Sequence, residues 1–178
     1  VLYPEDEIKK LGIKVTTVYI GGGTPSVLGE EITEVLEEVY SSFNICENAE
    51  ITAEANPEDI AFLKPAKAAG VKRLSIGAQS FDDCALKTLG RRHTAEDTVN
   101  FYKAAGSEGF LNISLDIMLG LPQKAGGIDD AQKMLELCPE HISAYILKRE
   151  QRTRFYKENT PLIIRCKGIR IAIINFTY

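Results

Sequence analysis

The sequence predicts an α/β protein in which parallel strands alternate with helices. Five short stretches are rich in β-branched and apolar residues, and each of the first four precedes a segment with apolar residues at helical spacing. Turns that contain glycine or proline separate the two kinds of segment. Such alternation indicates parallel strands joined by right-handed helical crossovers. Periodicity alone leaves two architectures open, a doubly wound sheet and a barrel.

The predicted strands are recognised by their composition and by the turns that end them. The first runs into the glycines of residues 21–23, the second ends at Asn56 and Pro57, and the fourth ends at Gly120 and Pro122. Residues of these kinds interrupt a strand. The five predicted strands cover Val15–Ile20, Glu50–Ala55, Arg73–Gly77, Asn112–Leu119 and His141–Leu147.

The predicted helices are recognised by apolar periodicity and by their ends. In the first, apolar residues recur three and four positions apart, which predicts a helix from Glu30 to Phe43. Thr94 can cap a helix from Ala95 to Glu108, and Gly109 can end it. The other predicted helices cover Ile60–Ala69, Asp82–Leu89 and Ile128–Leu137.

The C-terminal segment differs from the rest of the chain. Residues 159–178 contain no acidic residue, and their β-prone runs are poorly separated by turns. The basic residues Arg165, Lys167 and Arg170 within them exclude a membrane span. We expect one domain over residues 1–157 and a tail over residues 158–178. For the tail an edge strand, an unstructured segment and sequence foreign to the parent fold all stay open.

The bulk composition indicates a soluble globular protein. Hydrophobic residues make up 44% of the chain and charged residues 26%, which is not typical of disorder. The net charge of −4 provides no basic field for a nucleic-acid backbone, and no apolar run has the length of a membrane span. The cysteines lack metal-ligand spacing, so we expect free thiols in a reducing cytoplasm. They are Cys46, Cys84, Cys138 and Cys166.

Glycines and polar residues follow the first two predicted strands, at the end where parallel α/β folds bind ligands. Gly22 and Gly23 leave the backbone open to a ligand, and Thr24 adds a hydroxyl, although a tight turn also explains the glycines. Glu54 lies near the end of the second strand, where a buried carboxylate needs a partner. Ribose hydroxyls, a ligand ammonium or a structural Arg or Lys would each serve.

Three further polar residues lie at or after the later strands. Gln79 can donate and accept hydrogen bonds, although a turn glutamine is the simpler interpretation. Arg91 carries a guanidinium that suits a carboxylate, with a solvated basic turn as the alternative. Asp116 lies within the apolar fourth strand and needs either ribose hydroxyls or a basic side chain as a partner. His93 has no evident partner in the sequence, and we assign it no role.

The motifs at these strand ends, taken in order, resemble one family. It comprises the oxygen-independent coproporphyrinogen III oxidases and their haem-chaperone relatives, which are radical S-adenosylmethionine proteins. The similarity runs from about residue 10 to residue 157, and the segments of residues 77–81 and 141–145 look more like the haem-chaperone branch. The motifs are YIGGGTPS (residues 19–26), AEANP (53–57), RLSIGAQSF (73–81), LGRRH (89–93), DIMLGLP (116–122) and PEHISAY (139–145).

This resemblance implies a partial (β/α) barrel, similar to a TIM barrel, with S-adenosylmethionine at its open end. In the family a [4Fe–4S] cluster, reduced by an electron donor protein, cleaves that cofactor to a 5′-deoxyadenosyl radical. The radical abstracts hydrogen from a propionate of coproporphyrinogen III, and decarboxylation gives the vinyl groups. The haem-chaperone relatives bind and deliver haem instead. The resemblance places the cofactor contacts at Gly22, Gly23, Thr24, Glu54, Gln79, Arg91 and Asp116.

The family's cluster loop, Cys-x3-Cys-x2-Cys, precedes the first motif that this sequence matches. Three thiolates close together hold such a cluster, and the four scattered cysteines do not have that spacing. The resemblance therefore implies a chain that lacks the first barrel strand and the cluster ligands. A member of the enzyme family without activity in this form, a haem carrier and a non-catalytic remnant domain remain three open hypotheses.

Overall fold

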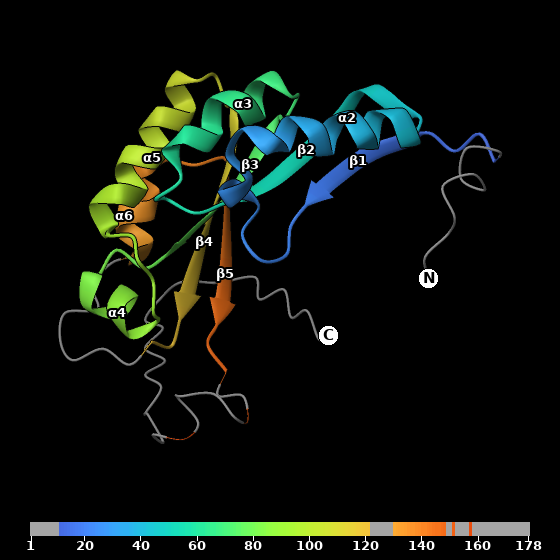
Figure 1. The fold of residues 1–178 in the computed structure, drawn as a ribbon. Helices are drawn as coiled ribbons and strands as arrows, with labels where there is room; N and C mark the ends of the chain where they lie inside the picture. The colour runs from blue at the N-terminus through green and yellow to red at the C-terminus, as the bar shows by residue number, and fades with distance from the viewer. Residues whose placement is uncertain (1–10, 122–129, 149–150, 152–156, 158–178) are drawn as a thin grey trace.

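The computed structural model describes residues 11–121 and 130–148, together with residues 151 and 157 (Figure 1). Five parallel strands form one sheet, and their order in space is their order in the sequence. A doubly wound sheet would reverse that order partway across. The sheet is thus singly wound, and it forms the half-barrel that the motifs imply. The strands are β1 (Val15–Ile20), β2 (Ile45–Ala55), β3 (Arg73–Gln79), β4 (Asn112–Leu119) and β5 (His141–Ile146).

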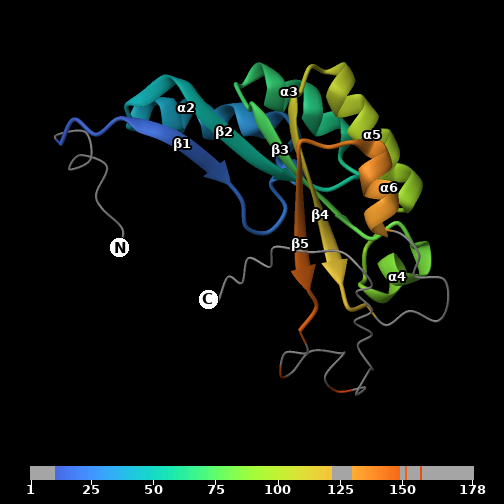
Figure 2. The ribbon, with the colours of Figure 1, turned by 180° about the vertical axis from the view of Figure 1, so that it is seen from behind.

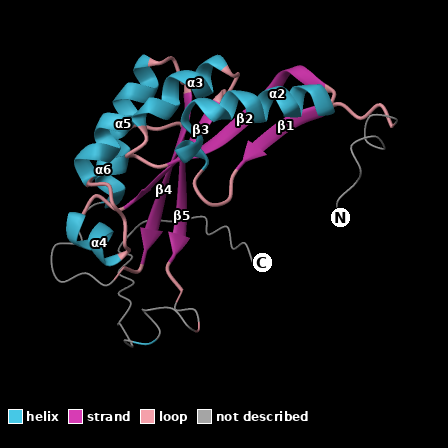
Figure 3. Cartoon of the chain, viewed as in Figure 1, coloured by secondary structure: helices cyan, strands magenta, loops and turns pink. Residues whose placement is uncertain are grey.

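The main helices lie together along one side of the sheet, as the views from the front and from behind both show (Figures 1 and 2). They are α2 (Ile32–Ser42), α3 (Leu63–Ala68), α5 (Ala95–Ser107) and α6 (Asp130–Leu137). The short helix α4 (Asp83–Thr88) lies near the carboxyl end of β4 (Figure 3). None of the described helices has the length and apolar character that crossing a membrane requires. These helices do not cover the other side of the sheet.

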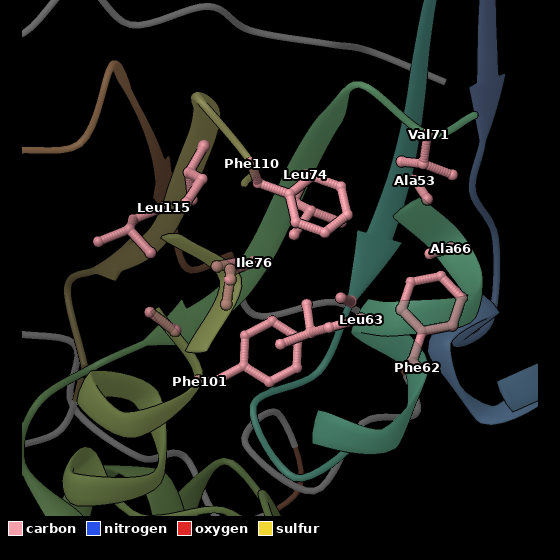
Figure 4. Close-up of a cluster of buried hydrophobic side chains, with 14 of the residues drawn as sticks. Ala53, Phe62, Leu63, Ala66, Val71, Leu74, Ile76, Phe101, Phe110 and Leu115 are labelled. Carbon is pink, nitrogen blue, oxygen red and sulfur yellow. The ribbon is translucent and has the colours of Figure 1, made fainter. Parts of the chain in front are cut away.

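The hydrophobic core lies between the sheet and these helices (Figure 4). Alternate residues of each central strand point into it, as the period of two in a strand requires. Leu74, Ile76 and Leu115 from the strands are fully buried there. They pack in one cluster with Phe62 and Phe101 from the helical segments. The polar residues between them in the sequence therefore face the opposite side of the sheet.

Side-chain hydrogen bonds cap the N-termini of two helices, α4 and α5. The Thr94 hydroxyl accepts a hydrogen bond from the Asp97 amide at 3.1 Å, and the Asp97 carboxylate accepts one from the Thr94 amide at 2.7 Å. This reciprocal pair is a capping box, which satisfies two amides that the helix leaves unpaired. Asp82 caps α4 by accepting from the amide of Cys84 at 2.8 Å. The predicted start of α5 at Ala95 is confirmed, whereas α4 begins at Asp83, one residue after the predicted Asp82.

Several predicted bounds shift in the structure. The helix expected from Glu30 begins as a 3-10 segment over Pro25–Glu31, and α2 follows from Ile32 after Gly29, whose φ is 55°. The helix expected from Ile60 likewise begins as the 3-10 turn Ile60–Phe62 before α3. Strand β2 starts at Ile45, five residues before the expected Glu50. The predicted helix start at Ile128 and the predicted tail over residues 158–178 lie outside the described residues, so the division at residue 157 stays a prediction.

Candidate functional site

A cavity of about 250 Å³ opens at the carboxyl ends of the strands. Six of the seven residues proposed from the sequence line it, and they come from five separate stretches of the chain. The seventh, Gly22, donates its backbone amide to Glu54 Oε2 at 3.2 Å. The structure thus brings the whole predicted set to one place, while the role of these residues in cofactor binding stays a proposal. The six are Gly23, Thr24, Glu54, Gln79, Arg91 and Asp116.

The parallel register explains why side chains distant in the sequence meet here. Glu54 on β2 is paired with Ser75 on β3, and Ser75 is paired with Ser114 on β4. Their neighbours Ala53 and Leu74 are fully buried in the core on the helix side. Because side chains alternate along a strand, Glu54 and Ser75 point to the other side. The cavity is therefore the polar counterpart of the hydrophobic core, on the opposite face of the same strands.

Glu54 is held by the glycine loop and by its neighbour on β1. Tyr19 donates its hydroxyl to Glu54 Oε1 at 2.7 Å, and burial together with this bond raises the pKa of the tyrosine. A Cβ on Gly21 would lie only 2.6 Å from the Tyr19 ring and 2.9 Å from Glu54 Oε1, so a larger residue there would displace one of these side chains. Within the described residues Glu54 forms no ion pair with Arg or Lys. The structural-cation alternative is therefore wrong for these residues.

The glycine loop is anchored to the end of β2 by side-chain hydrogen bonds. Ser26, which is buried, donates its hydroxyl to Asp59 Oδ2 at 2.5 Å and accepts from the Asn56 amide at 3.0 Å. The Asn56 side chain donates to the Thr24 hydroxyl at 3.5 Å. Gly22 and Gly23 have φ of 88° and 68°, which glycine adopts without the penalty other residues incur. These contacts fix the loop backbone against the cavity.

Asp116 lies on β4 with its carboxylate facing β3. The Ser75 hydroxyl lies 3.2 Å and 3.3 Å from its two oxygens. Burial raises the pKa of Asp116, and hydrogen bonds from Ser143 and Ser75 oppose that shift. A partly desolvated carboxylate with remaining acceptor capacity can bind ligand hydroxyls or an ammonium.

Gln79 and Arg91 form the side of the cavity beyond β3. Gln79 is nearly buried and has a φ of 62°, and the pairing of β3 with β4 shifts register between Ile76 and Gln79. A left-handed conformation at a non-glycine residue costs on the order of 1–2 kcal/mol and is found most often at functional sites. Arg91 follows Gly90 and donates its amide to the Leu86 carbonyl at 2.9 Å, which ties it to the end of α4.

The cavity includes residues that the sequence reasoning did not identify. Asn56, Ser75 and Tyr145 also line it. Ser75, Gly77 and Gln79 occur at every second position of β3, so a period of two counted back from Gln79 would have indicated Ser75. Asn56 was interpreted only as a strand-ending residue. Tyr145 carries no comparable signal, because a tyrosine in a strand is ordinary.

None of the three cysteines among the described residues lines this cavity, and the predicted free thiol of Cys166 lies outside those residues. Cys46 lies at the start of β2, Cys84 in α4 and Cys138 just after α6, each as a free thiol. Across the part of the chain that the structure describes, no three His, Cys, Asp or Glu side chains are close enough to hold a metal ion. The residues present therefore do not fit an iron–sulfur cluster, whereas the mixed polar lining of the cavity fits a small zwitterionic nucleoside.

A comparison of the sequence with protein-family models gives a match to the radical SAM superfamily over residues 3–137. The chain belongs to the radical SAM superfamily. Its fold agrees with that of a solved radical SAM enzyme, coproporphyrinogen III oxidase (HemN) from Escherichia coli, with a TM-score of 0.74 and 25% identity. That match covers 88% of this chain and 38% of the enzyme.

Among curated radical SAM relatives, the heme chaperone HemW of Haemophilus influenzae is 39% identical over 147 residues, covering 80% of this chain and 38% of HemW. The oxygen-independent coproporphyrinogen-III oxidase-like protein HemZ of Bacillus subtilis is 37% identical over 149 residues, covering 79% of this chain and 29% of HemZ. The chain thus spans 38% of the length of HemW and 29% of the length of HemZ.

Proposed function

We propose that the cavity binds S-adenosylmethionine and that the whole protein acts in tetrapyrrole metabolism. One observation carries the first part. Thr24, Glu54, Gln79, Arg91 and Asp116 surround a single cavity at the carboxyl edge of a half-barrel. Polar residues scattered at random over separate strands and loops would not be expected to line one cavity together. The second part rests on similarity to proteins named as heme chaperones and coproporphyrinogen oxidases.

The chemistry of the lining suits that cofactor. Arg91 can pair with the methionyl carboxylate through two parallel hydrogen bonds. Carbonyl groups of the glycine loop can accept from the methionyl ammonium, because no Cβ blocks them at Gly22 and Gly23. The carboxylates of Glu54 and Asp116 can accept from the ribose hydroxyls.

When bound in this family, S-adenosylmethionine supplies the 5′-deoxyadenosyl group as a carbon radical. The residues of this chain would bind and orient the cofactor. They include no cluster site among those described.

A haem-handling role is the form of this function that we favour. The HemW match has 39% identity, and the segments at residues 77–81 and 141–145 resemble that branch. Oxidative decarboxylation of coproporphyrinogen propionates, with an electron donor protein, is the second candidate, supported by the similarity to HemN and HemZ. Both candidates place a tetrapyrrole beside the same cofactor cavity.

Calorimetric titration of the chain with S-adenosylmethionine tests the cofactor proposal. We expect saturable binding of one molecule per chain, competition by S-adenosylhomocysteine, and no heat from ATP. The absence of binding would remove the proposal. A separate titration with haem, followed by absorbance, tests the branch. Saturable spectral change supports haem handling, and a flat titration counts against it.

A further inference from the structure

The buried imidazole of His93 lies behind the cavity wall. Its side chain is only 1% exposed. The Nε2 atom lies 3.2 Å from the Ala78 carbonyl oxygen, and Nδ1 lies 3.4 Å from Glu58 Oε2. His93 follows the cavity residue Arg91 by two positions but does not itself line the cavity. A buried imidazole needs hydrogen-bond partners for both ring nitrogens, and the atoms that face them indicate its protonation state.

Both ring nitrogens of His93 face oxygen atoms. A carbonyl oxygen only accepts hydrogen bonds, so Nε2 must carry the proton that faces Ala78. In a neutral ring Nδ1 would then present a lone pair to the Glu58 carboxylate, which repels it. His93 Nδ1 and Glu58 Oε2 are both buried, and neither atom forms a hydrogen bond with any described residue, although the two lie 3.4 Å apart. A ring that carries protons on both nitrogens removes this conflict.

The two partners of His93 do not line the cavity, but each lies within two residues of one that does. Ala78 immediately precedes Gln79, which lines the cavity in a left-handed conformation. Glu58 comes two residues after Asn56, which lines the cavity at the end of β2. The imidazole therefore bridges the segments that follow β2 and β3. A charged bridge of this kind resists the relaxation of a strained residue such as Gln79.

We propose that His93 is held as an imidazolium between Glu58 and the Ala78 carbonyl, and that it positions Gln79 and Arg91 for the ligand of the cavity. The positioning role rests on the proposed cofactor function, and the protonation state does not.

Three charged groups surround the ring. Glu58 faces it directly, Arg92 Nη2 lies 3.3 Å from the other oxygen of Glu58, and Asp97 lies on helix α5. Hydrogen bonds from Thr94 lower the pKa of Asp97, and burial opposes that shift.

Nuclear magnetic resonance of the ¹⁵N-histidine-labelled chain tests the protonation state without any ligand. The sequence contains two histidines, and the second, His141, is exposed and serves as an internal reference. Long-range ¹H–¹⁵N correlations at pH 7 should show both nitrogens of His93 protonated. In Glu58→Gln we expect one proton only, on Nε2. A singly protonated ring in the unaltered chain, or an unchanged doubly protonated ring in Glu58→Gln, would overturn the proposal.

Binding of S-adenosylmethionine to the same variants tests the positioning role. We expect Glu58→Gln to weaken affinity by about tenfold, as loss of a hydrogen bond to a charged group predicts. Arg92→Ala is the matched control, because the Arg92 side chain contacts the same carboxylate but is 80% exposed. This substitution should change the affinity for S-adenosylmethionine by less than about twofold. Equal affinity in Glu58→Gln and the unaltered chain would overturn the positioning role. If the unaltered chain binds no S-adenosylmethionine but shows a doubly protonated ring, the proposed function and the positioning role fail together, and the protonation state of His93 stands.

Discussion

The two faces of the same sheet differ in what their residues do. On the face toward the helices, Leu74 and Leu115 are fully buried among apolar neighbours. On the other face, Ser75 and Asp116, which follow them in the sequence, contact each other beside the cavity. Adjacent residues of one strand therefore lie separately in the hydrophobic core and beside the proposed ligand site. The contrast indicates that changes on the cavity face should alter binding more than folding.

The largest expected effect is on the helix face. Replacing Leu74 by Ala removes a fully buried side chain and leaves a cavity, so the free energy of unfolding should fall by about 3 kcal/mol. Ser75→Ala, one residue along, should cost about 1.5 kcal/mol, because it removes one hydrogen bond to a carboxylate and leaves no large cavity. Urea denaturation followed by circular dichroism measures both. Similar losses in the two variants would contradict the division between the faces.

The next effect is on ligand affinity. Glu54→Gln removes the charge that accepts from Tyr19 and from the Gly22 amide. We expect affinity for S-adenosylmethionine to fall at least about tenfold, while the free energy of unfolding changes by less than about 1 kcal/mol. Calorimetry and denaturation report the two quantities.

Glu50→Gln provides the matched control for this variant. Glu50 lies on the same strand, is exposed and accepts a hydrogen bond only from the Asn112 side chain among the described contacts. Its affinity for S-adenosylmethionine should equal that of the unaltered chain. Equal losses of affinity in the Glu50 and Glu54 variants would show that the carboxyl end of strand β2 contributes no specific contact to the ligand.

The smallest effect concerns Asp116 and pH. Burial raises its folded-state pKa above the unfolded value of 3.8, so the folded chain binds more protons once the pH exceeds about 4. The contribution of Asp116 to stability therefore falls as the pH rises from the unfolded pKa through the folded one. Asp116→Asn should be more stable than the unaltered chain at pH 7, by about 1 kcal/mol or less, and equally stable near pH 3. A variant that is less stable at both pH values would contradict this assignment.

Much of the fold could be predicted because periodicity reflects burial directly. Strands β1 and β4 begin and end where the apolar stretches do. The start of β2 could not be predicted, because residues 45–49 include polar residues and the register with β1 shifts between Val15 and Thr17. The 3-10 starts of two helices depend on local backbone geometry, such as the φ of 55° at Gly29, that composition does not encode.

The cavity could be predicted in part for a different reason. Residues at strand ends share one edge of a parallel sheet, so Glu54, Gln79 and Asp116 were expected together. The buried position of His93 was not predictable, since its partners are a backbone carbonyl and a carboxylate 35 residues earlier in the chain. Contacts of that kind depend on the tertiary fold alone.

The most direct test of the cavity's role is a map of backbone amide shifts in ¹H–¹⁵N spectra during titration with S-adenosylmethionine. We expect the amides of Gly22, Gly23 and Gln79 to shift together and saturate at one equivalent. The amides of Ala66 and Phe110, buried on the helix side, should stay in place. Shifts confined to the helix side, or none at saturating ligand, would contradict a cofactor site at the carboxyl ends of these strands.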